Sequence, residues 1–356
     1  MNNRKDINDR LVDWIINKVK TEYPDDISMV LIYGSYLNGT SNDKSDVDCY
    51  YIPKTERGYK MTVQFIIEGA GYDIFPMSWE KIAGIAELKE TMSPLVGDVK
   101  IIYVSSTDDL NRFKSLQERL KTNLSDSDYV KAIAKQRCEE ASRLCAWMNI
   151  SEKPSEVRKL AGNIIMILAD AVAIYHHDYF HFGLKKQFEN LQNNFKDIPK
   201  SIVEDYKNVI QAVNADEVKG YALHMLWDVC EYLGVKFTLP DATLPSQTSN
   251  VKTDATGLAS LYEEICSTFN KIYVCCERKN YILAFLSAVC LQRGLDDARE
   301  SGCPEYDLLG DFNYTKLSQL HDITKKVESD FVKFIKEKGG IIKEYESFEL
   351  FKMAKL

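Results

Sequence analysis

The sequence lacks any long apolar run: no stretch approaches the roughly eighteen consecutive apolar residues of a membrane-spanning helix. Its first ten residues carry charges of both signs and no apolar segment of the kind found in signal peptides. An excess of basic residues is also missing, since 53 acidic residues against 45 basic ones give a net charge of −8. We therefore expect no membrane partner, and we disfavour a nucleic-acid partner, whose binding normally needs a basic surface.

Cysteine pairs at the spacing of a metal site are lacking as well, although the chain has nine cysteines; Cys275 and Cys276 are adjacent but have no second pair to complete such a site. Most sit singly in apolar helical contexts, as Cys138, Cys145, Cys230 and Cys290 do. We interpret them as reduced thiols of the protein core. Together with the N-terminus, this predicts a cytoplasmic protein.

The 356 residues are too many for one ordinary domain, and 45% of them are hydrophobic, which is enough for sizeable cores. Helix and strand patterns alternate over the first 105 residues, whereas helical periodicity prevails from about residue 125 onward. This predicts an α+β protein in which an N-terminal mixed β-sheet precedes an all-α region. The predicted segments are a catalytic domain 1–124, a helical substrate-binding domain 125–237, a linker 238–257 and a C-terminal helical domain 258–356.

Hydrophobic periodicity places the individual elements. Leu11, Ile15 and Val19 recur at helical spacing before Pro24, which predicts an N-terminal helix. Alternating or β-rich runs predict strands at 28–33, 46–52, 61–68, 72–77 and 99–104. Apolar stripes predict later helices around 130–148, 155–174, 258–273, 282–291 and 317–335.

One stretch carries the pattern of a chemical site. The strand at 28–33 runs into Gly34 and Ser35, where a residue without Cβ lets backbone N–H groups approach a phosphate and a hydroxyl adds a donor. Asp46 and Asp48 alternate around Val47, so on a strand their side chains leave the same face while Val47 enters the core. The stretch therefore predicts a phosphate cradle beside a pair of carboxylates.

Two carboxylates about 4 Å apart repel by roughly 4 kcal/mol at an effective dielectric constant near 20, so the pair needs a counter-ion. Ligands that are all oxygen, shared with phosphate, favour magnesium over zinc. A third acid, Asp73, lies between Tyr72 and Ile74 in a short apolar strand, where an unbound carboxylate is costly. The alternative is that Asp73 pairs with a basic side chain.

This pattern resembles the nucleotidyltransferase superfamily that includes DNA polymerase β, and within it the bacterial antibiotic nucleotidyltransferases. The family has a strand, Gly-Ser or Gly-Gly, a loop, an acid-apolar-acid strand and a third acid on a later strand. The positions that match are Gly34, Ser35, Asp46, Asp48 and Asp73. Thr40 and Ser45 are similar to two further elements of its members that act on small substrates. The resemblance covers residues 28 to 105.

The resemblance implies an NTP held by Gly34 and Ser35, with Thr40 and Ser45 nearby, and two magnesium ions held by the three aspartates. It implies transfer of a nucleoside monophosphate from the NTP, with ATP as the expected donor, to a hydroxyl, with release of pyrophosphate. The helical remainder is similar in layout to the substrate-binding half of the kanamycin and lincosamide nucleotidyltransferases. The expected acceptor is accordingly an antibiotic-like small molecule, and the expected role is antibiotic resistance.

Two other functions stay open. The same aspartates would serve a nucleotidyltransferase that acts on protein or nucleotides, in toxin control or phage-defence signalling. A catalytically silent nucleotide-binding module would keep the fold without turnover. The sequence also leaves open the general base and whether a homodimer completes the site.

The helical region offers weaker candidates. Asp170 is the one acid within 164–174, so it is either hydrogen-bonded inside the bundle or turned to a cleft as a base. His176, His177 and His181 cluster near the end of the same helix, but no cysteine or carboxylate completes a familiar zinc spacing. A helix-end role is the favoured interpretation for these histidines.

Overall fold

A computed structural model of the chain describes residues 3–39, 44–241 and 254–354. The chain divides into two compact units. The sheet unit contains Met1–Asn123, Ala255–Asn270 and Gly339–Leu356, and the helical unit contains Leu124–Asp254 and Lys271–Lys338. Residues 258–356, a separate domain in the sequence-based division, are thus distributed over both units.

The sheet unit is built on a mixed six-stranded sheet in the order β5-β1-β2-β4-β3-β6. Strands β2 and β4 run parallel, as do β3 and β6, and the remaining neighbours are antiparallel. The strands are β1 (Ile27–Tyr33), β2 (Asp48–Pro53), β3 (Val63–Ile67), β4 (Ala70–Pro76), β5 (Lys100–Val104) and β6 (Glu344–Tyr345).

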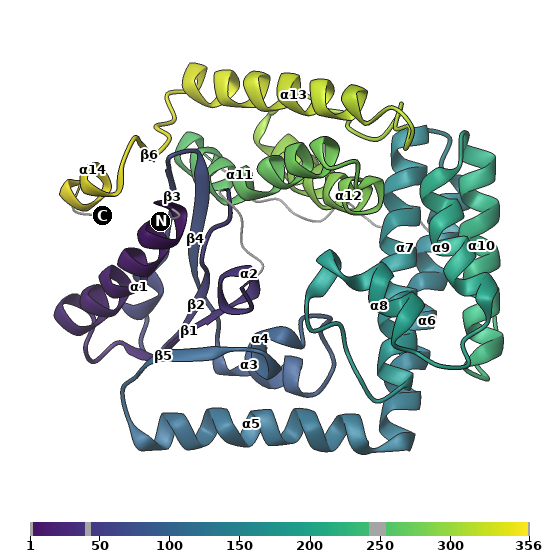
Figure 1. Cartoon of the computed structure of the whole chain (residues 1–356), viewed down its shortest axis with the longest axis horizontal. Coiled ribbons are helices and arrows are strands. Elements are labelled where there is room, and N and C mark those ends of the chain that lie inside the picture. Colours follow the sequence, from purple (N-terminus) through teal and green to yellow (C-terminus); the bar gives the residue numbers. More distant parts are fainter. Residues whose placement is uncertain (1–2, 40–43, 242–253, 355–356) are drawn as a thin grey trace. The chain divides into compact units, whose positions relative to one another are not determined.

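One face of this sheet carries the main apolar core of the unit. Helix α1 (Asn3–Glu22) lies beside the sheet (Figure 1), and its stripe Ile7, Leu11, Ile15 and Val19 is fully buried. Alternate strand residues and the C-terminal helix α14 (Phe348–Met353) complete the same cluster. The alternate strand residues therefore pack against the helical stripe of α1 in one core.

The other face of β4 approaches the first half of helix α11 (Ala255–Glu277). A Cβ added at Gly71 would lie 2.6 Å from the carbonyl oxygen of Glu263 and 2.8 Å from Cβ of Cys266. Only glycine allows the helix this close to the strand. Asn270 donates a hydrogen bond to the carbonyl oxygen of Gly69 at 2.7 Å, which ties the helix to the β3–β4 turn.

Short helices join the strands of the sheet unit, and the longer helix α5 begins in this unit. These helices are α2 (Gly34–Leu37), η1 (Gly58–Met61), α3 (Trp79–Ala86), α4 (Pro94–Gly97) and α5 (Thr107–Ser125).

In the helical unit, the apolar helix α7 packs against α6, α9, α10 and α12 (Figure 1). Its elements are α6 (Ser127–Ile150), α7 (Pro154–Tyr175), η2 (Gly183–Lys185), α8 (Gln187–Asn193), α9 (Lys200–Gln211), α10 (Ala215–Tyr232), α12 (Tyr281–Ala298), η3 (Arg299–Ser301) and α13 (Leu317–Glu337).

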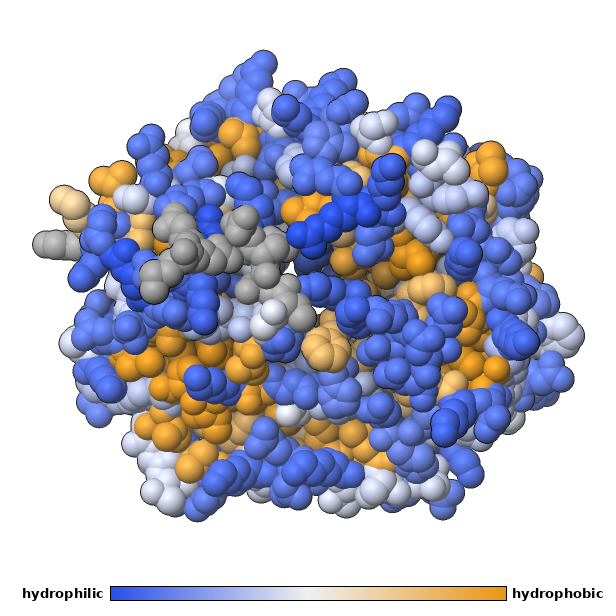
Figure 2. Space-filling model, viewed as in Figure 1, coloured by the Kyte–Doolittle hydropathy of each residue, from blue (hydrophilic) through white to orange (hydrophobic). Residues whose placement is uncertain are grey.

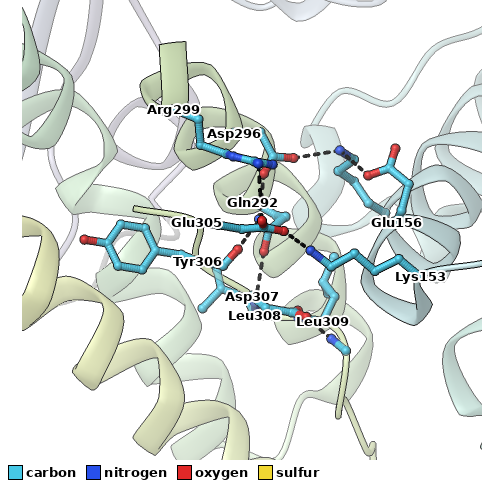
Figure 3. A network of polar contacts seen from close by, with 12 residues as sticks. Lys153, Glu156, Gln292, Asp296, Arg299, Glu305, Tyr306, Asp307, Leu308 and Leu309 are labelled. Carbon is cyan, nitrogen blue, oxygen red and sulfur yellow. Dashed lines mark hydrogen bonds and ion pairs between the residues drawn. The ribbon is translucent and has the colours of Figure 1, made fainter. Parts of the chain in front are cut away.

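A polar network joins α7, α12 and the loop after η3 (Figure 3). The buried Gln292 donates to the carbonyl oxygen of Tyr306 and accepts from the backbone N–H of Leu308, both at 2.9 Å. Asp296, one turn further along α12, accepts from Gln292 at 2.9 Å and pairs with Lys159 of α7 at 2.6 Å. The amide of Gln292 therefore supplies the partners that this buried loop backbone would otherwise lack.

The α+β fold predicted from the sequence is confirmed, with three local corrections. Strand β2 begins at Asp48 rather than Asp46, because β1 ends at Tyr33, which pairs with Asp48. The predicted linker ends early, since α11 already begins at Ala255. The C-terminal region is not wholly helical, because β6 adds to the sheet edge; two residues are too few for an alternation pattern.

The surface and the cysteines agree with the composition. Hydrophilic residues are spread over much of the face that Figure 2 draws, with hydrophobic ones between them. Within the described ranges, no helix combines the length and apolar character needed to cross a membrane. All nine cysteines lie within those ranges as free thiols, and eight of them are buried.

Candidate active site

Four polar side chains form a row across the sheet at the end of β1. Tyr33 of β1 is the register partner of Asp48 of β2, and Gln64 of β3 is the partner of Asp73 of β4. The parallel pairing of Cys49 with Ile74 sets Asp48 beside Asp73 on the neighbouring strand. Equivalent positions on paired strands point to the same face, about 4.8 Å apart. The fold thus brings two of the predicted aspartates together from positions 25 residues apart in the sequence.

Gly34 packs against the carboxylate of Asp48. Gly34 has φ +74°, a left-handed conformation that residues with a Cβ rarely adopt. A Cβ built there would lie 1.9 Å from Oδ2 of Asp48. Glycine is therefore required twice, once by its backbone conformation and once by the carboxylate packed against it.

Asp73 is held by an amide rather than by a cation. Nε2 of Gln64 donates a hydrogen bond to Oδ1 of Asp73 at 2.8 Å. Burial raises the pKa of Asp73, and the Gln64 hydrogen bond opposes that rise. In the described part of the chain Asp73 takes part in no ion pair, so the alternative of a basic partner finds no support there.

Asp46 and Ser45 lie in the loop before β2. Val47 is 2% exposed, as the alternation predicts, while Asp46 and Asp48 on either side of it are half-buried. The backbone carbonyl of Ser45 accepts a hydrogen bond from Asn8 of α1 at 3.3 Å, which fixes this loop to the helix. Ser45 is therefore positioned near the aspartates by its main chain.

The charges of all three aspartates act on the hydroxyl of Tyr33. Burial raises its pKa well above the usual value, and the charges of Asp48, Asp46 and Asp73 raise it further. All three aspartates thus lie close enough to the end of β1 for their charges to act on the Tyr33 hydroxyl.

Their carboxylates form an all-oxygen donor set of the kind that Mg²⁺ prefers, and Gly34 leaves room for Asp48 within it. The residues therefore fit magnesium by donor chemistry. Among the described side chains, however, these three do not form a group whose ligand atoms all lie within 4.8 Å of one another. A single ion bound by all three would require them to move closer together.

The other predicted nucleotide-binding positions are placed in part. Ser35 follows Gly34 in the short helix α2 and is half-buried directly after β1. Thr40 lies outside the described residues. The turn after β1 therefore retains Gly34 and Ser35 as its candidate phosphate contacts.

Glu264 of α11 is a fourth acid that the sequence analysis missed. Its side chain is solvent-exposed, yet surrounding protein raises its pKa, and the charge of Asp73 raises it further. Its neighbour Glu263 is fully buried and accepts from the backbone N–H of Lys343 at 2.5 Å. Glu264 is 191 residues from Asp73 in the chain, and the only local signal is an acid pair within an apolar helical stripe.

The candidates in the helical unit have structural partners. Asp170 is buried in the bundle and accepts a hydrogen bond from Nε of Arg137 at 2.9 Å, which decides between its two interpretations. Burial raises the pKa of Asp170 to about 6, and Arg137 opposes the rise.

The three histidines near the end of α7 separate. His176 hydrogen-bonds the hydroxyl of Tyr232 at 2.9 Å, His177 the carbonyl oxygen of Leu124 at 2.5 Å, and His181 the carboxylate of Asp178 at 3.1 Å. They belong to no group of metal-ligand atoms in the part of the chain that the structure covers.

No protein-family model matches the chain, and no curated protein matches it in sequence.

Proposed function

We propose that the protein is a magnesium-dependent nucleotidyltransferase that moves a nucleoside monophosphate, AMP from ATP, to a hydroxyl of a small molecule. The observation that carries the proposal is the contact between Gly34 and Asp48, with Asp73 beside Asp48 on the next strand. A left-handed glycine directly after a strand, against a carboxylate, is an economical way to bring phosphates and an acid pair together. The resemblance of residues 28–105 to the polymerase β superfamily supports the same reaction.

The chain's own groups divide the work. Asp46, Asp48 and Asp73 would hold the magnesium ions, which, when bound, supply charge neutralisation to the triphosphate. The backbone N–H groups and hydroxyl at Gly34 and Ser35 would orient the phosphates. Catalysis of this kind depends mainly on positioning and electrostatics.

At the α-phosphorus, the transfer forms one bond and breaks one. The acceptor oxygen bonds to the α-phosphorus, the bond from that phosphorus to the bridging oxygen breaks, and pyrophosphate leaves. The hydroxyl proton passes to a carboxylate. Asp73 and Glu264 are the candidates, because their surroundings raise the pKa of both carboxyl groups.

The acceptor class follows from charge. With 53 acids against 45 bases, the chain suits a small cationic acceptor, such as an aminoglycoside-like compound, better than a polyanion. A lincosamide-like acceptor fits the resemblance equally. Nine free thiols suit the reducing cytoplasm as the place of action.

Pyrophosphate release, measured over the four NTPs and a panel of hydroxyl-bearing antibiotics with Mg²⁺, tests donor and acceptor together. Asp48→Asn should abolish the release, while Asp13→Asn, at an exposed position of α1, should keep it. Circular dichroism and the thermal midpoint check that both variants fold. Retained release in Asp48→Asn would refute the site assignment.

Two further outcomes separate the alternatives. Labelled ATP incubated without an acceptor would label the protein, or yield a cyclic product, if the acceptor is protein or nucleotide. A lack of magnesium-dependent NTP binding in calorimetry would favour a silent module.

A further inference from the structure

A second cluster of ligand groups lies in the helical unit, outside the proposed active site. Asp205 is on α9, and His224 and Asp228 are one turn apart on α10. The two helices pack side by side (Figure 1). One ligand atom from each of the three residues lies within 4.8 Å of the other two. Among the described residues, no other three histidines, cysteines or acids meet this criterion.

Both carboxylates converge on the same ring nitrogen. Nδ1 of His224 contacts Oδ2 of Asp205 directly and lies 3.7 Å from Oδ2 of Asp228. Positions four apart on a helix share one face, so α10 presents His224 and Asp228 together toward α9. Asn208 of α9 also hydrogen-bonds Asp205, and such second contacts orient metal-binding carboxylates.

The charges at this cluster do not balance without a cation. The side chains of Asp205 and Asp228 are only 7% and 14% exposed, and within the described ranges neither pairs with a lysine or an arginine. One protonated imidazole leaves a net charge of −1 on the three groups. A divalent cation with two carboxylates and a neutral imidazole leaves none, and buried charges are stable when they are paired or metal-bound.

We propose that Asp205, His224 and Asp228 bind a divalent transition-metal ion of the zinc type. The bound ion joins α9 to α10. An imidazole nitrogen favours such an ion over Mg²⁺ or Ca²⁺, which prefer oxygen ligands alone. Three protein ligands leave one tetrahedral position, and His224 is 51% exposed, so solvent reaches the site. This metal site shares no residue with the proposed nucleotidyltransferase active site.

Zinc binding to the full chain tests the proposal. The protein is stripped with EDTA and titrated with ZnCl₂ in calorimetry without nucleotide. We expect one tight site, weakened at least tenfold in Asp228→Asn and in His224→Gln. The matched control is His181→Gln, because His181 pairs with the carboxylate of Asp178 but lies outside the three-residue ligand group found among the described residues; this variant should bind zinc like the parent. Asp48→Asn should also bind like the parent, which separates this site from the sheet.

Two further readouts make the result decisive. Co²⁺ in place of zinc should give visible absorption without a thiolate charge-transfer band, since no cysteine belongs to the cluster. Zinc should raise the thermal midpoint of the parent and of His181→Gln, but not of His224→Gln. Absence of tight binding, binding unchanged in Asp228→Asn and His224→Gln, or a thiolate band would each overturn the proposal, and metal-free circular dichroism verifies folding.

Discussion

Gln64 donates a hydrogen bond to Asp73 at 2.8 Å across the β3–β4 pair. The bond stabilises the ionised carboxylate against the burial that raises its pKa. An amide supplies this partial compensation without a charge, so the carboxylate keeps its capacity to bind a cation. Gln64 is thus a positioning residue that could not be recognised from the motif.

Gln64→Leu should shift the acidic limb of the activity profile to higher pH. Losing the donor raises the pKa of Asp73 further, so at a given acidic pH a smaller fraction of Asp73 is ionised. Pyrophosphate release measured against pH checks this. Thr62→Val is the matched control, because Gln64 also contacts the Thr62 hydroxyl, at 3.2 Å, and that change leaves the bond to Asp73 in place. An unmoved acidic limb in Gln64→Leu would separate Asp73 from the pH dependence.

Gly34→Ala should impair both folding and activity. The left-handed conformation costs about 1 to 2 kcal/mol with a Cβ, and the clash with Asp48 adds to this. Gly234→Ala is the control, because Gly234 has φ +66° with nothing within 4 Å of its Cβ position, so it bears the conformational cost alone. Urea unfolding should show the larger loss for Gly34→Ala, together with at least a tenfold loss of pyrophosphate release. Equal losses in the two variants would contradict the contact.

The pH dependence of stability should reveal the titration of the Asp170 carboxyl group. Its pKa rises from 3.8 to about 6 on folding, so between these values the folded state binds more protons than the unfolded state. Stability from this group is therefore greatest below pH 4 and falls as the pH rises to about 6, by up to about 3 kcal/mol. Asp170→Asn lacks this titration. The free energy of unfolding of the parent minus that of Asp170→Asn should fall from pH 4 to pH 7, and a constant difference would contradict the raised pKa.

The features that the sequence predicts correctly are those that depend on residues close together in the chain. Alternation around Val47, the apolar stripe of α1 and the strand ending at Gly34 each depend on residues a few positions apart, and the structure keeps them. The contacts missed from the sequence are long-range. Gln64 acts through strand register, and Glu264 and β6 come from the chain's last third, where no period marks which strand they will meet. The Asp205 cluster likewise needs two helices to pack before its ligands meet.

Glu263 and Glu264 should separate stability from catalysis. Glu263 is fully buried and holds the segment before β6 through the backbone N–H of Lys343 and its ammonium group, at 2.5 and 3.1 Å. Glu263→Gln should therefore lower the free energy of unfolding by about 1 to 3 kcal/mol, because a charged hydrogen-bond acceptor becomes neutral. Glu264→Gln should leave stability within about 0.5 kcal/mol, since the side chain is exposed.

If Glu264 accepts the proton from the acceptor hydroxyl, Glu264→Gln should instead lower kcat at least a hundredfold with little change in the KM for ATP, because general bases contribute that much to a proton transfer. Parallel urea unfolding and steady-state kinetics on both variants measure the two effects. A Glu264→Gln variant with parental kcat would leave Asp73 as the base, since Asp73 is the other candidate and burial raises its pKa.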